Sequence, residues 1–158
     1  MEMMKFKKYS LVYFEALKSK LPQFDEFEVK FLELAYLSSK TKNKGIIKYI
    51  LSKQLGPQAN GIDVNHESLS IEHLISEAEI KNGVNESVVG SIGNLILVDG
   101  KTNSEVLKNS SAARKIDTLD EMGYPIAKCF IIRGTWTEIK VMERVRKIAA
   151  ELYASCAM

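Results

Sequence analysis

The chain has 158 residues, of which 46% are hydrophobic and 27% are charged, and its formal net charge at pH 7 is +2. This length fits one domain with a buried core, and no apolar run approaches the roughly 20 residues that a membrane-spanning helix needs. Residues 1–8 are basic, but no apolar stretch with a cleavage site follows them, so we expect a cytoplasmic protein without a signal peptide. Cys129 and Cys156 lie far apart, which argues against a disulfide framework or a structural zinc site.

Charge is distributed unevenly along the chain. Residues 1–60 carry 11 basic and 6 acidic side chains, residues 61–99 carry 1 and 7, and residues 100–158 carry 10 and 7. An acidic centre between basic flanks suits a cation site bordered by surfaces that tolerate phosphate. Solvated helix faces would give the same counts, and on charge alone they are the better explanation.

The first third of the chain, residues 1–57, is predicted to be helical. Apolar residues recur at helical spacing in residues 9–21, then from Asp25 to about Lys40, and again in residues 45–55. These helices could form a small bundle that packs against the rest of the chain, a remnant of a larger domain, or a surface for a partner.

The remainder, residues 58–158, is predicted to begin with two short strands. A polar linker leads into a strand at residues 69–75, and a second strand follows at residues 95–98. Between them, residues 76–91 are polar and acidic, and we expect an excursion with about one helical turn. Asp99-Gly100 is typical of a turn.

Helices are predicted after the second strand. Thr102 or Asn103 is expected to cap the first, and another helix is expected at residues 110–119. Residues 126–132 could be a helix or a strand, and we favour a helix. A final helix is predicted with Thr135 as its N-cap and Glu138 at the capping-box position. The predicted fold class is therefore α+β, mostly helical, with one compact domain.

Four side chains with metal-binding or proton-transferring chemistry gather in the central part. Glu72 and His73 are adjacent in an apolar run, Asn94 opens the second strand, and Asn103 lies at the start of a helix. Each has an ordinary structural explanation: a core histidine, a paired acid, a loop-holding amide and a helix cap. All four together favour a functional site. The other histidine, His66, is expected at the surface of the linker.

The pattern formed by Glu72-His73, Gly93-Asn94-Leu95 and Asn103 resembles the ββα-metal fold of the HNH endonucleases, in the His-Asn-Asn version of the motif. With Lys115 and its neighbours, it is more narrowly similar to the C-terminal nuclease domain of GmrSD-type modification-dependent restriction enzymes. The similarity covers roughly residues 40–155.

The chain departs from the family pattern at several positions. Ser76 stands where proline is frequent, and Ala112 stands where phenylalanine is common. The spacing from Asn103 to Asn109 is one residue longer than usual. The sensor domain that precedes the nuclease domain in such enzymes has no counterpart in these residues.

The resemblance implies an α+β domain with a ββα-metal core that hydrolyses phosphodiester bonds with one Mg²⁺ or Mn²⁺ ion. His73 would be the general base, Glu72 and Asn103 would bind the metal, and Asn94 would complete the catalytic motif by holding the loop between the strands. Contacts with the DNA backbone would come from basic residues beyond the motif: Lys115, Lys108 and Arg114.

DNA is the implied substrate, restriction or anti-phage defence is the implied role, and a separate sensor or recruiting protein is a further implied partner. Two alternatives stay open: a non-catalytic module that binds DNA or a partner, and a helical scaffold in which His73 is only a core residue. Adjacent residues of a regular strand point to opposite faces, so Glu72 and His73 share one metal site only where the strand breaks, as the resemblance implies.

Overall fold

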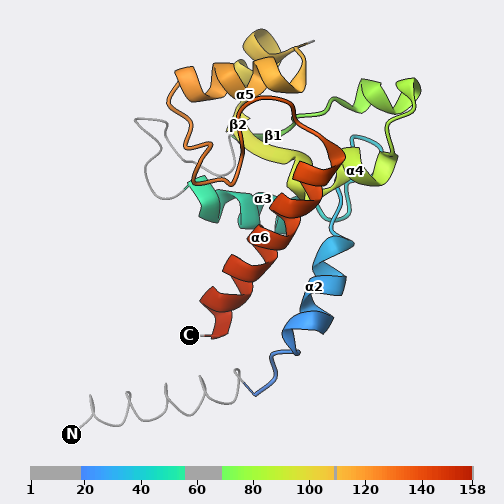
Figure 1. Ribbon diagram of the computed structural model, residues 1–158, viewed down its shortest axis with the longest axis vertical. Helices are drawn as coiled ribbons and strands as arrows, with labels where there is room; N and C mark the ends of the chain where they lie inside the picture. Colours follow the sequence, from blue (N-terminus) through green and yellow to red (C-terminus); the bar gives the residue numbers. More distant parts are fainter. Residues whose placement is uncertain (1–18, 56–68, 109, 158) are drawn as a thin grey trace, which may run out of the picture.

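The computed structural model describes residues 19–55, 69–108 and 110–157. In chain order its elements are α2 (Phe24–Leu32), α3 (Lys44–Leu55), β1 (Leu69–His73), the 3₁₀ helix η1 (Glu77–Asn82), α4 (Glu86–Gly90), the 3₁₀ turn η2 (Ile92–Asn94), β2 (Leu95–Asp99), the π-helical segment η3 (Thr102–Leu107), α5 (Ala112–Glu121) and α6 (Glu138–Ala157) (Figure 1). This mixture of helices with one two-stranded sheet confirms the α+β class in its coarse form. Most of the helix predicted for residues 9–21, and the linker with His66, lie outside the described residues.

The two strands form an antiparallel hairpin at the centre of the molecule. Their register runs from Leu69 opposite Asp99 to His73 opposite Leu95. β2 is buried from Leu95 to Val98, so both faces of the hairpin must be covered. A strand buried on both faces needs a continuous apolar sequence, and β2 has one.

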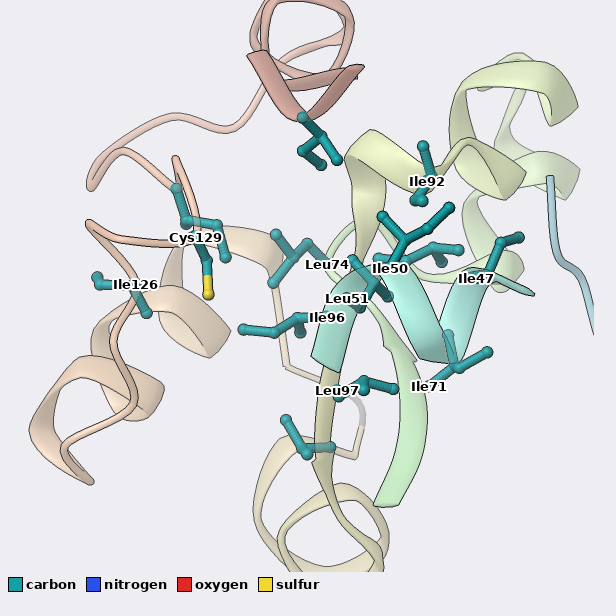
Figure 2. Packing of buried hydrophobic residues seen from close by; sticks show 14 of the residues in the cluster. Ile47, Ile50, Leu51, Ile71, Leu74, Ile92, Ile96, Leu97, Ile126 and Cys129 are labelled. Atoms are coloured by element: carbon teal, nitrogen blue, oxygen red, sulfur yellow. The ribbon is translucent and has the colours of Figure 1, made fainter. Parts of the chain in front are cut away.

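Helix α3 covers one face of the hairpin. Figure 2 shows Ile47, Ile50 and Leu51 of α3 beside Ile71 and Leu97 of the strands. All five side chains are at most 9% exposed. The first region of the chain is thus joined to the strands through a shared apolar core.

The other face of the hairpin is covered by the segment after α5. Ile126 and Cys129 lie toward Ile96 in Figure 2, and all three are buried. Residues 126–132 were predicted to be a helix, and this prediction is wrong. They form turns in which Phe130 has a φ of 58°. This left-handed backbone ends the turn and is incompatible with a continuing helix.

Helix α6 packs on the turn that precedes β2. A Cβ atom added at Gly93 would overlap the carbonyl oxygen of Val141 and the side chain of Val145, so α6 touches the backbone of η2 directly. Further along, α6 packs against α2 (Figure 1), where the Tyr153 ring lies 5.3 Å from the rings of Phe24 and Phe27.

Helix α2 is shorter than predicted. It ends at Leu32, not near Lys40, and the next residues are extended. The Tyr36 amide donates to the Gly90 carbonyl at 2.8 Å, and Ala35 forms a bridge with Ser91. Because these backbone groups pair with Gly90 and Ser91, the residues just before η2 in the chain, a longer helix is not needed to satisfy them.

Smaller differences concern the helix caps. The α6 helix begins at Glu138 with Thr137 accepting from the Lys140 amide at 3.4 Å, so Thr135 is not its cap. Neither Thr102 nor Asn103 caps the first helical segment after β2; instead, the Asp99 carboxylate accepts from the Thr102 amide at 2.9 Å. The excursion at residues 76–91 contains η1 and α4, which is more helix than predicted.

None of the helices in the described ranges has the length and hydropathy needed to cross a bilayer.

Candidate active site

Glu72 and His73 are the last two residues of β1. Glu72 is paired with Ile96 and His73 with Leu95, and directly opposed residues share a face of the sheet. The two side chains therefore lie on opposite faces. The strand break that the resemblance implied between them is absent, because the pairing with β2 continues through His73.

A polar hollow of about 340 Å³ lies on the Glu72 side of the hairpin. Its walls come from the end of β1, from η3 and from α5. The lining residues are Glu72, Ser76, Asn103, Ser104, Lys108 and Lys115. The hollow thus brings together both predicted metal ligands and two of the three basic residues predicted to contact DNA. Arg114 is exposed and is not part of this lining, nor is His73.

Lys115 lies inside the site and forms an ion pair there. Its Nζ is 2.6 Å from Oε1 of Glu72 and donates to the carbonyl oxygen of His73 at 2.7 Å. Lys115 is only 3% exposed, whereas Lys108 in the same hollow is exposed. This position differs from the contact with the DNA backbone that the sequence predicted for Lys115.

The imidazole of His73 is held in place by Tyr36 and Glu77. Its Nε2 is 3.0 Å from the Tyr36 carbonyl oxygen and 3.5 Å from Oε1 of Glu77, and its ring is stacked on the Tyr36 ring at 5.8 Å between centroids. A carbonyl oxygen can only accept, so Nε2 carries the hydrogen and the lone pair of the neutral ring is at Nδ1. Nδ1 bonds to none of the described residues, so this atom is available to accept a proton.

Tyr36 and Glu77 are the parts of this site that sequence reasoning missed. Glu77 accepts from the amide and the hydroxyl of Ser38, at 2.8 and 2.6 Å, which ties η1 to the extended segment that carries Tyr36. No sequence signal marked Tyr36, because the residues around it fit the spacing of a helix as well as that of an extended segment.

Asn94 holds the loop that follows His73. It is fully buried, and its amide group bonds both the N–H and the C=O of Ile75, at 2.8 and 2.9 Å. The same amide donates to the Val89 carbonyl at 2.8 Å and accepts from the Trp136 indole at 3.4 Å. The side chain takes the place of a further residue in the β-ladder and fixes where β1 ends.

Asn103 is positioned by the turn at Asp99. The Asp99 carboxylate accepts from the amide and the hydroxyl of Thr102 and from the Tyr124 hydroxyl. Burial raises the pKa of Asp99, but these hydrogen bonds outweigh it and hold the pKa below its usual value. The Asn103 side chain is half-buried and bonds to no other residue in the described part of the chain, so its oxygen is free to bind a ligand.

The donors of the hollow suit a hard cation. In the described ranges no group of three or more His, Cys, Asp and Glu side chains could hold a metal ion. Glu72 and Asn103 offer one carboxylate and one amide oxygen. Mg²⁺ is commonly bound through one or two carboxylates, with water and phosphate oxygens completing the shell, so these residues fit it.

A family model describing the C-terminal domain of the GmrSD restriction endonucleases matches residues 21–151. The chain belongs to this family. No curated protein and no solved structure gives a match. The GmrSD match begins at Leu21, well before the similarity noted from the sequence, so α2 and α3 lie within the matched region together with the hairpin and the hollow.

Proposed function

We propose that the chain is a metal-dependent DNA endonuclease that hydrolyses phosphodiester bonds in restriction or anti-phage defence. The observation that carries this proposal is the polar hollow in which Glu72, Asn103 and two lysines meet, at the end of the strand that also carries His73, in a chain of a restriction-endonuclease family. We further propose that β1, β2 and η3 are a ββα-metal core of the HNH type.

His73 would act as the general base. The bond from Nε2 to the Tyr36 carbonyl supports this role, because it fixes the tautomer and leaves Nδ1 to take the proton from the attacking water. Asn94 contributes by fixing the loop next to His73 through its two bonds to Ile75. It is a positioning residue, since its amide is fully occupied by protein partners.

Glu72 and Asn103 would hold Mg²⁺ or Mn²⁺, which would supply charge stabilisation to the phosphate and the leaving oxygen. The exposed Lys108 and Arg114 would contact the DNA backbone, since a long cationic side chain at the rim of a site can reach a phosphate. A separate sensor or recruiting protein would choose the target DNA.

The test is plasmid nicking by the purified chain with Mg²⁺ or Mn²⁺, against an EDTA control. We expect nicking that requires the metal and falls by about a hundredfold or more in His73→Ala, since a positioned general base contributes on that scale. Circular dichroism of both proteins checks that they are folded. Glu79→Ala, which changes a residue of η1 outside the hollow, is the control variant and should nick like the wild type.

Metal-independent nicking, or full activity in a folded His73→Ala protein, would exclude this mechanism. Absence of nicking by the folded wild type on modified and unmodified plasmids would favour a module that binds DNA or a partner without cleaving.

A further inference from the structure

Lys115 contacts both residues at the end of β1, Glu72 and His73. Its ammonium group is 2.6 Å from the Glu72 carboxylate and 2.7 Å from the His73 carbonyl oxygen. The side chains of Lys115 and Glu72 are 4% and 14% exposed, so this ion pair is largely shielded from water. A shielded pair interacts far more strongly than one on the surface.

The pair accounts for the position of Glu72. An unpaired carboxylate with so little exposure would be costly, and in the described part of the chain Lys115 is its only ionic partner. Glu72 also lines the hollow, together with Asn103, so the carboxylate that Lys115 pairs with is the one that the hollow presents to a ligand.

We propose that Lys115 is the internal counter-ion of Glu72 and competes with the divalent cation for this carboxylate. The inference rests on the proposed function, in which Glu72 is a metal ligand. A divalent cation on the same carboxylate lies close to the ammonium group and is repelled by it. Lys115 therefore lowers the affinity of the site for metal and stabilises the metal-free protein. It is a positioning residue, and the exposed Lys108 is left as the lysine of the hollow that reaches DNA.

Lys115 also bonds the carbonyl oxygen of the next residue, His73, so metal binding at Glu72 would affect that residue as well. A cation that displaced the ammonium group from Glu72 would move a side chain that also bonds the backbone of His73, the residue whose ring would take the proton. Metal binding and the end of β1 are thereby linked through one side chain.

The experiment compares Lys115→Met with Lys108→Met, which removes an exposed lysine from the same hollow and serves as the matched control. Mn²⁺ affinity is measured by titration calorimetry, and Tm is measured in EDTA and in Mn²⁺. We expect Lys115→Met to bind Mn²⁺ about tenfold more tightly or better, because a like charge is removed from the site. We also expect its Tm to be lower in EDTA and to rise more with Mn²⁺ than that of the wild type. Lys108→Met should stay close to the wild type in both readouts.

Two further variants cover the case in which Lys115→Met fails to fold. Glu72→Gln/Lys115→Met removes both charges, and we expect it to recover the Tm lost in EDTA and to show no response to Mn²⁺. Lys115→Arg keeps the charge and should keep an affinity for Mn²⁺ close to that of the wild type.

The proposal is overturned when folded Lys115→Met binds Mn²⁺ no more tightly than the wild type, or when the double variant recovers none of the Tm in EDTA. Nicking by the wild type distinguishes a failure of this proposal from a failure of the proposed function. If the wild type nicks with metal while Lys115→Met gains no affinity for Mn²⁺, only the role of Lys115 as counter-ion is contradicted. A wild type that neither binds Mn²⁺ nor nicks contradicts both.

Discussion

Asp99 and Asn94 shape the site, although neither of them lines the hollow. Asp99 fixes the turn from β2 into η3 by accepting from the Thr102 amide at 2.9 Å and from the Tyr124 hydroxyl at 2.9 Å. Asn94 fixes the loop after β1 through Ile75. The two residues stand at opposite ends of β2, so each determines the position of one side of the hollow.

Asp99 is expected to make the stability of the protein sensitive to acid. Its folded-state pKa lies below the usual value, which means that the ionised form is favoured by folding. Its contribution is therefore complete above the unfolded pKa of about 4 and is lost as the pH falls through the lower folded pKa. We predict that Asp99→Asn lowers the free energy of unfolding by about 1–2 kcal/mol at neutral pH, since it weakens hydrogen bonds to an ionised acceptor.

Urea unfolding of the wild type and Asp99→Asn at pH 7, 5 and 3 checks this. The difference between the two proteins should be equal at pH 7 and pH 5 and smaller at pH 3. Asp117→Asn, on the exposed side of α5, is the control and should leave stability unchanged. A difference that grows as the pH falls would contradict the assignment of Asp99 as an ionised acceptor.

Four of the six residues that line the hollow could be named from the sequence, but their partners could not. Glu72, Asn103, Lys108 and Lys115 were all marked by residue type, spacing and family resemblance, and they do line one cavity. That Lys115 would face Glu72 depends on how α5 sits over the hairpin. Such a placement is decided by contacts between residues 43 positions apart, which no local pattern records.

At the scale of elements, the approach of α6 to the turn before β2 is set by Gly93. An added Cβ there would overlap the Val141 backbone, which cannot move without shifting the helix. We predict that Gly93→Ala lowers the free energy of unfolding by about 3 kcal/mol or more, because overpacking against backbone finds no flexible side chain to give way.

Gly45 offers a matched control for Gly93. It lies in the first turn of α3, and an added Cβ would meet nothing within 4 Å. Gly45→Ala should leave the protein unchanged or stabilise it by up to about 1 kcal/mol, because alanine favours the helix. Thermal unfolding of the two variants compares them directly. A Gly93→Ala protein as stable as Gly45→Ala would show that α6 is free to move away from η2.

The strands, α3 and α6 were predicted from the sequence because each has a clear apolar pattern. The extended segment after α2 and the turns at residues 126–132 were not. Leu34 and Leu37 are three residues apart, so they fit a helix even though the segment pairs with Gly90 and Ser91 instead. In the first case a tertiary hydrogen-bond partner overrode the local pattern, and in the second the left-handed backbone of Phe130 ended the turn.

At the scale of the whole molecule, Arg144 joins four parts of the chain. It is 1% exposed, and its guanidinium donates to the carbonyl oxygens of Gly93, Leu95 and Cys129 at 2.9, 2.6 and 2.7 Å and to the Gln54 side chain at 3.3 Å. Burial lowers the pKa of Arg144 to about 10, so the group stays charged at neutral pH. Among the described residues no carboxylate pairs with it, and the charge is compensated there by the dipoles of the carbonyl groups that accept its hydrogen bonds.

Removing this group should weaken all four parts together. We predict that Arg144→Met lowers the free energy of unfolding by about 3–5 kcal/mol, because three backbone carbonyls lose their donor in the interior. Arg144→Lys should recover only a part, since one ammonium group cannot reproduce the planar fork in which Nη1 bonds Gly93 and Leu95 while Nε bonds Cys129. Arg146→Met, an exposed position on the same helix, is the control and should change stability by less than about 0.5 kcal/mol.

Native-state hydrogen exchange shows whether Arg144 stabilises all four parts of the chain that it joins or only its own helix. In Arg144→Met, amide protection should fall together in α3, in β2, in the turns before α6 and in α6 itself, because each loses its link to the others. Loss of protection confined to α6 would mean that Arg144 stabilises only its own helix. A uniform loss would instead identify the guanidinium as the group through which α6 fixes the hairpin, and with it the ends of β1 and β2 on which the hollow is built.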